Sequence, residues 1–417
     1  MTGNQIALSF GDVREKSIST PNHFVSHMVE HIAWRMGLTV KVLWEDEDWF
    51  ALGTALGQKI RSLPQGNSEA IAFGMIDDGS ATVAVERGEP SVEWSAVGGV
   101  DLEWFLQLRC EQIDSGTPLV SLLEGLSCGL GARITIEIWA LEDPHHTWEG
   151  IYRGVGIALS HLFYDSSAIQ SAESNLEADS VVFKNDDLAS EIAILEYSAH
   201  SATVRRGTAE TGITVQLNLR ERTPCSFQFE VDQSIGLSLT GMETLLQRFA
   251  SQLGAHLSVQ FSAKTLSSSH VVMEDIGLVL GRALLEIMKY RMLNHGIQGA
   301  GSNISREHAS PVEVGVSVEG RKFWRLIPED GNFNSLRKEL LIGHTILGGC
   351  RSEDLDDFID GLSGGLSASI ALHIRISRDA EKTWLSIFSA LGEALRKALQ
   401  PNPYRKGVPP GVKATLA

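Results

Sequence analysis

PLVSLLEGLSCGLGARITIEIWAL, residues 118–141, contains the pattern that decides the fold. Its first part has apolar residues at intervals of three and four, which predicts an amphipathic helix that ends at Gly131. Its second part alternates β-branched residues with others, and we expect a short hairpin of strands there. Another amphipathic helix is predicted directly afterwards, within residues 146–163.

The same plan recurs four times along the chain of 417 residues: strands, a helix, a short hairpin and a second helix. Repeats have to be found first, because a missed repeat assigns the whole fold wrongly. The four half-domains cover residues 1–63, 68–163, 204–290 and 310–400. We therefore expect an α+β protein of four repeated half-domains, each a mixed β-sheet covered by two helices, paired into two similar domains.

Residues 164–200 interrupt this order, because they are polar and acidic. Such a composition predicts a linker or a surface excursion. The first domain is then expected at 1–163, and the second at 201–417, where the last residues form a C-terminal tail.

The composition is that of a globular protein, with 43% hydrophobic and 21% charged residues. A formal net charge of −17 argues against a nucleic-acid or anionic-membrane partner. No apolar run is long enough to span a bilayer, and the first residues do not resemble a secretory signal. The cysteines form no CxxC pair, so we expect reduced thiols and a cytoplasmic location. They are Cys110, Cys128, Cys225 and Cys350.

His145, His146 and Glu149 stand at the start of a predicted helix. Positions i and i+4 share a helix face, so His145 and Glu149 can grip one ion, while the neighbouring histidine can reach a second. Imidazole with carboxylate suits manganese, iron or zinc. The other interpretation is the exposed start of a helix, with Asp143 as cap and Pro144 at the first position. The motif is short, and both interpretations stay open on spacing alone.

Six stretches share motifs with one known family. They are SHMVEHIAWRMG (26–37), PHHTWEGIYRGVGIAL (144–159), RRGTAETGITVQLNL (205–219), SHVVMEDIGLVLGRAL (269–284), VSVEGRKFW (316–324) and KGVPPGVKATL (406–416). In order and spacing they resemble imidazoleglycerol-phosphate dehydratase, and the chain looks like two domains of that family fused in tandem. The resemblance implies half-domains of the ribosomal protein S5 domain 2-like fold.

The resemblance also implies a metal site. The family binds manganese through two H-H-x-x-E helices and a histidine on the helix before each, with one N-type and one C-type half. The positions carried over as metal ligands are His27, His145, His146, Glu149, His270 and Glu274. Glu149 and Glu274 are also the candidate catalytic carboxylates. We expect the second and third half-domains to build one reduced metal site, which His27 could join as a further ligand. The site would hold about one Mn²⁺ or other divalent ion per chain.

The remaining ligand positions of the family have other residues here. They are Asp46, Glu47 and Phe50 in the first half-domain, Ser121 in the second, Val271 and Thr244 in the third, and Asp357, Glu381, Lys382 and Leu385 in the fourth. The first and fourth half-domains are therefore expected to form a decayed site, where Lys382 substitutes a charge for a metal.

The function implied is that of a divergent, metal-dependent dehydratase of the histidine-biosynthesis type. Its substrate would be a small phosphorylated compound like imidazole glycerol phosphate, with Arg321, Arg405 and Lys413 as phosphate-binding candidates. The resemblance also implies a trimer-based homo-oligomer. The alternative is a non-catalytic paralogue that acts as a structural or regulatory partner, because half of the ligand positions are lost. A small-molecule sensor is a third class, which no residue specifically favours.

Overall fold

The computed structural model of the protein describes residues 3–11, 16–177, 181–183, 192–209, 211–231, 239–263, 269–305, 311–375 and 379–411. They form two compact units, and each is described by itself. Unit 1 contains the described residues of Met1–Glu173 and Pro401–Lys413, and unit 2 contains those of Ser174–Gln400. Among the described residues, no helix combines the length and the apolar character needed to cross a membrane.

The first half of unit 1 is a three-stranded sheet with two helices. Its elements are β1 (Gln5–Phe10), β2 (Lys16–Ser19), α1 (His23–Met36), β3 (Leu38–Leu43) and α2 (Trp49–Arg61). The strand order is β1-β3-β2, where β1 runs antiparallel to β3 and β2 runs parallel to it. Gly37, at φ 71°, ends α1 in the left-handed conformation and lets the chain turn directly into β3.

The second half of unit 1 repeats this plan with one strand more. Its elements are β4 (Glu69–Ile76), β5 (Gly79–Arg87), β6 (Ser91–Ala96), α3 (Leu102–Gln107), α4 (Thr117–Leu130), β7 (Ala132–Ala140) and α5 (Pro144–Leu162). The strand order is β4-β5-β7-β6, and β6 runs parallel to β7. Ile134, Ile136 and Ile138 alternate along β7 and are fully buried, so one face of the sheet belongs to the core.

Unit 2 is built from two further halves. The elements of its first half are β8 (Val182–Phe183), β9 (Ile192–Tyr197), β10 (Ser201–Gly207), β11 (Thr211–Asn218), β12 (Ser226–Glu230), α7 (Thr240–Leu253), β13 (His256–Ala263) and α8 (His270–Asn294). Those of its second half are β14 (Ala300–Ser305), β15 (Val312–Val318), β16 (Phe323–Pro328), α9 (Phe333–Leu336), β17 (Thr345–Ile346), β18 (Cys350–Arg351), α10 (Ser352–Leu366), β19 (Ala368–Ile374) and α11 (Ala380–Ala398).

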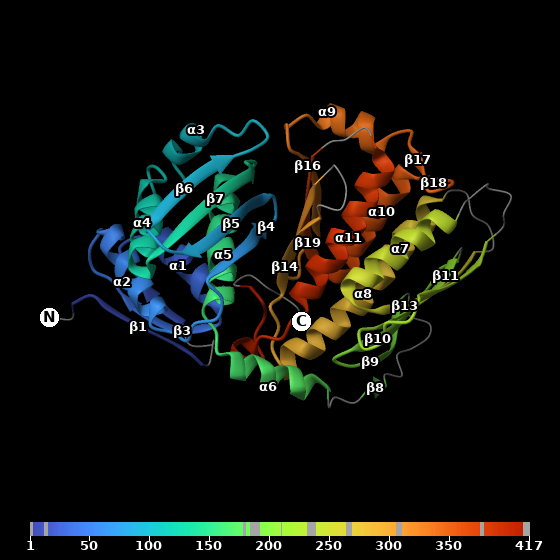
Figure 1. The fold of residues 1–417 in the computed structure, drawn as a ribbon, viewed down its shortest axis with the longest axis horizontal. Coiled ribbons are helices and arrows are strands. Elements are labelled where there is room, and N and C mark those ends of the chain that lie inside the picture. The colour runs from blue at the N-terminus through green and yellow to red at the C-terminus, as the bar shows by residue number, and fades with distance from the viewer. Residues whose placement is uncertain are drawn as a thin grey trace. The chain divides into compact units, whose positions relative to one another are not determined.

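The two large sheets of unit 2 have the orders β12-β13-β11-β10-β9-β8 and β14-β15-β19-β16, and β17 and β18 form a small two-stranded sheet. In both, the last strand of the half lies between a parallel and an antiparallel neighbour, as it does in unit 1. Figure 1 shows α7, α8, α10 and α11 between the two large sheets of unit 2, so each of these sheets covers one side of the helix layer. The expected α+β fold of repeated half-domains is therefore confirmed.

One detail of the sequence prediction is wrong. The segments expected to be hairpins after the first helices are single strands, namely β3, β7, β13 and β19. In the middle of its sheet, β7 is paired on one edge with β5 and on the other with β6. The N–H and C=O groups on both edges of β7 are hydrogen-bonded to strands that come earlier in the chain. The second strand of the expected hairpin is therefore not needed.

The segment predicted to be an acidic linker contains regular structure in its described part. Residues 164–200 include α6 (Ser166–Glu177), β8 and β9. Strand β9 runs antiparallel to β10, and β8 pairs with β9, so both extend the first sheet of unit 2.

Glycines set the distance between two pairs of packed helices. In unit 1, α2 packs on α4, and a Cβ at Gly53 would lie 2.1 Å from the carbonyl oxygen of Leu122. In unit 2, α8 packs on α10, and a Cβ at Gly277 would lie 2.2 Å from the carbonyl oxygen of Phe358. The glycines at these seams are Gly53, Gly57, Gly125 and Gly129 in unit 1, and Gly277, Gly281, Gly361 and Gly365 in unit 2. The two backbones touch, and no larger residue fits without separating the helices.

Substitution of a seam glycine should destabilise unit 2. For Gly277→Ala we expect a loss of about 3 kcal/mol in the free energy of unfolding, because the new methyl group meets backbone atoms that cannot move aside. Gly207→Ala is the matched control, since a Cβ there has no atom within 4 Å. Denaturant unfolding of both variants checks the prediction, and equal stabilities would contradict it.

A second prediction concerns Asp356 in α10. Burial, followed by the charges of Asp357 and Asp360, raises the pKa of Asp356 from 3.8 to about 7. The folded state then holds a proton that the unfolded state releases, so this group lowers stability progressively as the pH rises from about 4 to 7. Asp356→Asn removes the penalty and should stabilise the protein by about 1 kcal/mol at pH 8, after allowance for solvent screening.

The gain from Asp356→Asn should shrink toward pH 4, where both states of the native protein hold the proton. Thermal unfolding of the two proteins between pH 4 and pH 8 measures this dependence. Asp114→Asn, at an exposed carboxylate with 98% side-chain accessibility, is the control that should show no such trend. A gain that does not depend on pH would contradict the assignment.

Candidate functional site

A polar seam joins α1 and α5 in unit 1, where glycines join α2 and α4. His27, His31 and Arg35 follow each other at intervals of four on α1, as do His145, Glu149 and Arg153 on α5. Such residues lie on one face of a helix, and these two faces meet. The two helices run in the same direction, because His27 lies at the level of Glu149, and a Cβ at Gly156 would lie 2.8 Å from the Cβ of Arg35.

Three imidazoles converge on the carboxylate of Glu149. Its Oε1 lies 2.8 Å from Nε2 of His27, 3.0 Å from Nε2 of His145 and 3.4 Å from Nε2 of His31. Glu149 is fully buried and His31 is 1% exposed, whereas His27 and His145 retain about a quarter of their side-chain exposure. The structure thus joins His27 to the H-H-x-x-E motif, and it places the group at the contact between the first two half-domains.

Three of these atoms are close enough to surround one ion. The ligand atoms of His27, His31 and Glu149 lie within 4.8 Å of one another. Nε2 of His27 and Nε2 of His31 are 3.2 Å apart. Imidazole nitrogens combined with a carboxylate suit Mn²⁺, Fe²⁺ or Zn²⁺, so this donor set fits a divalent metal. We call His27, His31, His145 and Glu149 the histidine cluster.

Carboxylates outside the cluster hold the other ring nitrogens. Nδ1 of His27 lies 3.2 Å from Oε2 of Glu30, and Nδ1 of His145 lies 2.9 Å from Oε1 of Glu111. In both rings this leaves Nε2 directed at Glu149. Histidines that bind a metal commonly donate their second N–H group to a carboxylate in this way.

The charges of the cluster are strongly coupled. Burial opposes protonation of His27, but hydrogen bonds to Glu149 and Glu30 outweigh it and raise the pKa of His27 to about 8. Burial, followed by the positive charge of Arg153, lowers the pKa of His31 well below 6.5 and keeps that ring neutral. Burial would raise the pKa of Glu149, but its histidine neighbours hold that pKa below its usual range. A neutral imidazole and an ionised carboxylate are the forms that bind metal.

The EDPHHTWEGI stretch (142–151) is the start of a helix, as one of its two interpretations predicts, and metal binding by its histidines stays a prediction. Asp143 caps α5 by accepting the N–H of His145 at 2.8 Å, and Pro144 occupies the first position. The cap aims the first turn of α5 at α1, so the same turn starts the helix and supplies the cluster.

His146 lies outside the cluster. Its Nδ1 is 2.6 Å from Oδ1 of Asp78 and its Nε2 is 3.7 Å from Oδ2 of Asp77, in the turn between β4 and β5. That turn approaches α5 so closely that a Cβ at Gly79 would lie 2.0 Å from the carbonyl carbon of His146. The turn therefore holds the second histidine of the motif away from Glu149.

Arginines continue the polar seam into the core of unit 1. Arg35 is 1% exposed, Arg153 is fully buried and Arg405 is 1% exposed. Burial, followed by the charges of Arg153 and Arg405, lowers the pKa of Arg35 well below its usual value. The guanidinium of Arg405 donates to the carbonyl oxygen of Pro410, and burial lowers its pKa to about 9. This bond lies within residues 401–411, and Nε1 of Trp34 in α1 joins the segment to unit 1 by donating to the carbonyl oxygen of Pro409 at 3.0 Å.

The remaining phosphate candidates are placed elsewhere. Arg321 is exposed in the turn between β15 and β16 of unit 2. Lys413 lies outside the described residues. The structure therefore does not test the three residues as one phosphate site, and that assignment stays a prediction.

His270 and Glu274 lie on the first turns of α8 in unit 2, and both are exposed. Asp357 of α10 is close to them: burial first, and Glu274 as well, raises its pKa, while His270 lowers it. Within the described residues, no three histidine, cysteine or carboxylate ligand atoms around His270 and Glu274 lie as close together as those of His27, His31 and Glu149. The predicted site shared by the second and third half-domains stays a prediction.

The contact of α7 with α11 in unit 2 corresponds to the polar seam of unit 1 but has different chemistry. Thr244 and Leu385 stand at the positions of His27 and Glu149. Arg248 spans the two helices and donates to the carbonyl oxygen of Leu385 at 3.1 Å and to Oγ of Ser389 at 2.5 Å. Of the two charged residues noted in the sequence, Glu381 accepts the N–H of Leu347, and Lys382 pairs with Asp379 at 2.7 Å.

A cavity of about 260 Å³ opens beside His27. It is lined by Lys16, Ile18, His23, Ser26, His27 and Glu30, so one ligand of the cluster and its supporting carboxylate face it. The ammonium of Lys16 lies 4.0 Å from the centre of the Trp34 ring. The cavity therefore has one cation, Lys16, and one carboxylate, Glu30, at its wall next to one residue of the cluster.

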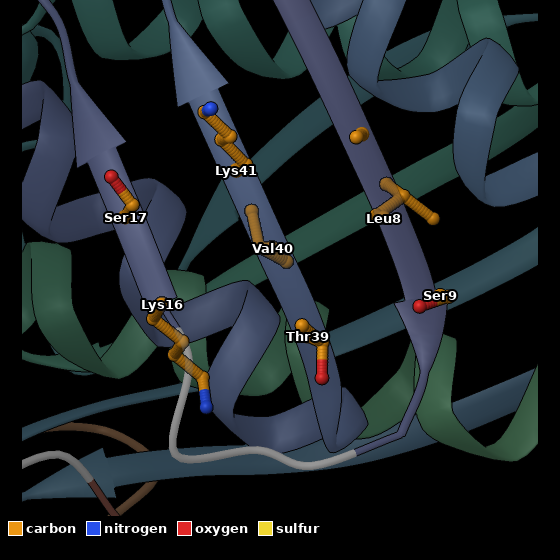
Figure 2. Close-up of a pocket in the computed structure, with 8 residues that line it drawn as sticks. Leu8, Ser9, Lys16, Ser17, Thr39, Val40 and Lys41 are labelled. Atoms are coloured by element: carbon orange, nitrogen blue, oxygen red, sulfur yellow. The ribbon is translucent and has the colours of Figure 1, made fainter.

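A larger hollow of about 480 Å³ lies over the sheet of β1, β3 and β2. Figure 2 shows Lys16 and Lys41 on neighbouring strands there, with their ammonium groups toward opposite ends of the sheet. None of the residues that line it belongs to the histidine cluster.

Sequence reasoning missed several residues of the site. The spacing of four between His27 and His31, and between His31 and Arg35, was a usable signal, because it repeats the spacing of His145, Glu149 and Arg153. No such signal existed for Glu111, which approaches His145 from the loop between α3 and α4.

Comparison with known proteins finds similarity to one family. Residues 236–395 match the family model of imidazoleglycerol-phosphate dehydratase. The imidazoleglycerol-phosphate dehydratase of Leuconostoc mesenteroides is 28% identical over 210 residues, which cover 50% of this chain and 96% of that protein. The enzyme of Lactiplantibacillus plantarum is 28% identical over 209 residues, covering 50% and 95%. A solved dehydratase structure from Pyrococcus furiosus has 24% identity and a TM-score of 0.36, covering 48% of this chain and 94% of that one.

The family match and the histidine cluster lie in different units. Residues 236–395 belong to unit 2, whereas the four residues of the cluster belong to unit 1. The strand order β4-β5-β7-β6 of unit 1 corresponds to β14-β15-β19-β16 of unit 2, which relates the two parts by topology.

Retained metal should depend on the residues of the histidine cluster and not on His270 and Glu274. We expect about one Mn²⁺ per chain, measured by elemental mass spectrometry on protein purified with manganese and without a polyhistidine tag. His27→Ala and His145→Ala should each lower retained metal at least 10-fold, because each removes an imidazole from the cluster. His270→Ala is the control and should retain metal. Loss of metal in His270→Ala with retention in His27→Ala would favour the site of the second and third half-domains instead.

Proposed function

Because residues 236–395 match the family model of imidazoleglycerol-phosphate dehydratase, we propose that the chain is a divergent, metal-dependent hydro-lyase. Its working site is the histidine cluster of unit 1. The observation that carries the proposal is the convergence of three imidazoles on the single buried carboxylate of Glu149. The substrate is a small phosphorylated imidazole-like compound, since the relatives named above are imidazoleglycerol-phosphate dehydratases.

His27, His31 and Glu149 would hold the metal, with His145 completing the set. When bound, a divalent metal supplies Lewis acidity toward an imidazole ring and a departing hydroxyl group. Arg153 contributes by keeping His31 neutral, which leaves its Nε2 available as a ligand. Glu149 has no exposed surface and lies among three rings, so it serves as a ligand rather than as a mobile proton carrier.

Glu30 is the carboxylate best placed to move a proton. It lines the cavity beside His27, retains 34% side-chain exposure, and its Oε2 lies 3.2 Å from Nδ1 of His27. A carboxylate at the wall of a substrate cavity can accept a proton from carbon or return one to a leaving oxygen. Lys16, on the same wall, offers a point charge for the substrate phosphate. Arg321, Arg405 and Lys413 remain the alternative phosphate set.

Unit 2 takes a different part in this proposal. Its α7–α11 contact joins Arg248 to Leu385 and Ser389, and we assign that contact a supporting role without metal. This is also the specific observation in favour of the second candidate, a non-catalytic paralogue that acts as a structural or regulatory partner. A trimer-based assembly in the cytoplasm would suit either function.

The role of Lys16 can be tested by kinetics with imidazole glycerol phosphate. Lys16→Ala should raise KM about 10-fold and leave kcat nearly unchanged, because a uniform binding contact to the phosphate is lost. Lys41→Ala is the matched control: Lys41 shares the hollow of Figure 2 with Lys16 but does not line the cavity beside His27.

Metal content should be unchanged in both lysine variants. A fall in kcat with unchanged KM in Lys16→Ala would contradict the phosphate role. Absence of turnover in the native protein that retains metal would favour the non-catalytic candidate.

A further inference from the structure

The loop between α3 and α4 touches both helices of the polar seam. Cys110 and Ile113 close it by two backbone hydrogen bonds of 3.0 Å, one in each direction. Their side chains are 6% and 2% exposed, so the base of the loop is anchored in the core. Glu111 and Gln112 stand at the tip between these two anchors. A short loop with buried ends and two polar residues at its tip holds those residues in fixed directions.

Gln112 fixes the start of α1. Its Oε1 accepts the N–H of His23 at 3.1 Å, and its backbone carbonyl accepts Nδ2 of Asn22 at 3.1 Å. Asn22 is itself the cap of α1 and accepts the N–H groups of Phe24 and Val25. The loop therefore controls where α1 begins, one turn before His27.

Glu111 fixes the start of α5. Its Oε1 lies 2.9 Å from Nδ1 of His145, and the other nitrogen of that ring is directed at Glu149. Two adjacent residues of one tight loop thus hold the two helices that supply the cluster. The separation of α1 and α5 at this end depends on the loop, in a way that neither helix could set alone.

The backbone of Glu111 is held in an unfavourable conformation. Its φ is 50°, in the left-handed region that suits glycine and costs other residues about 1 kcal/mol or more. A glycine would be the low-energy choice for this turn. A glutamate at this position lowers local stability but places a carboxylate next to His145. Residues with strained backbones of this kind are concentrated at functional sites.

We infer that Cys110–Ile113 is a positioning loop for the histidine cluster, in which Glu111 directs His145 and Gln112 sets the start of α1. Glu111 is a positioning residue, because it acts through His145 and does not face Glu149. The inference rests on the proposed metal function of the cluster and deepens it. It adds an outer carboxylate whose loss weakens metal binding without the removal of any ligand.

The test is the affinity of the full-length protein for Mn²⁺, measured by calorimetry on protein freed of metal. Glu111→Gln keeps the size of the side chain, and Glu111→Gly removes it while relieving the positive φ. We expect both variants to bind Mn²⁺ about 10- to 100-fold more weakly than the native protein. Asp114→Asn, at an exposed carboxylate just outside the loop, should bind as the native protein does.

Glu111→Gly separates positioning from stability. Because glycine tolerates a φ of 50°, we expect this variant to unfold at the same temperature as the native protein or a higher one, although it binds Mn²⁺ more weakly. Retention of native affinity in Glu111→Gly and Glu111→Gln would overturn the inference while the metal function stands. Failure of the native protein to bind Mn²⁺ would overturn both.

Discussion

The burial of one carboxylate constrains the whole of unit 1. Glu149 has no exposed surface, and a buried carboxylate is tolerated only when it is paired and hydrogen-bonded. Its partners come from two half-domains: His27 and His31 from α1, and His145 from its own helix. Removal of the partners of a buried charge typically costs about 3–5 kcal/mol, so the contacts that hold α1 and α5 in register stabilise unit 1. The same requirement that holds the halves together also concentrates imidazole and carboxylate donors at one point.

The two units show two solutions to the same packing problem. Where α2 meets α4 and α8 meets α10, glycines bring the backbones into contact, and these seams are present in both units. Where α1 meets α5 the seam is ionic, but the corresponding seam of α7 and α11 has Leu385 at the position of Glu149. A buried carboxylate and its histidines form one energetic group, because the loss of either leaves the other unsatisfied. In unit 2 every position of the group has another residue, namely Thr244, Arg248, Glu381 and Leu385, so no buried carboxylate or histidine is left at these positions without its partners.

Much of the fold could be predicted from the sequence, because helix periodicity and repetition are local. The stripe of PLVSLLEGLSCGLGA predicts α4 within a few residues, and the repeated order of elements predicts four related halves. The strand pairing was harder: alternation in RITIEIWAL shows that β7 is a strand, but not that β5 and β6 satisfy both of its edges. The position of His27 at the H-H-x-x-E motif came from a family pattern, whereas that of His31 could have come from spacing. Glu111 lies 34 residues before His145, and no local rule joins a loop residue to a helix so far along the chain.

The family match and the histidine cluster lie in different units, and the contacts described above help to explain this difference. The family model matches residues 236–395, where the glycine seam of α8 and α10 and the surrounding core dictate residue types at many positions. The histidine cluster depends on four side chains and their supports, spread over two halves of unit 1. A packed core depends on many side-chain contacts and a site on a few, so similarity of a core does not by itself locate a site. In this chain the family model matches a segment of unit 2, whereas the histidine cluster proposed to hold a metal lies in unit 1.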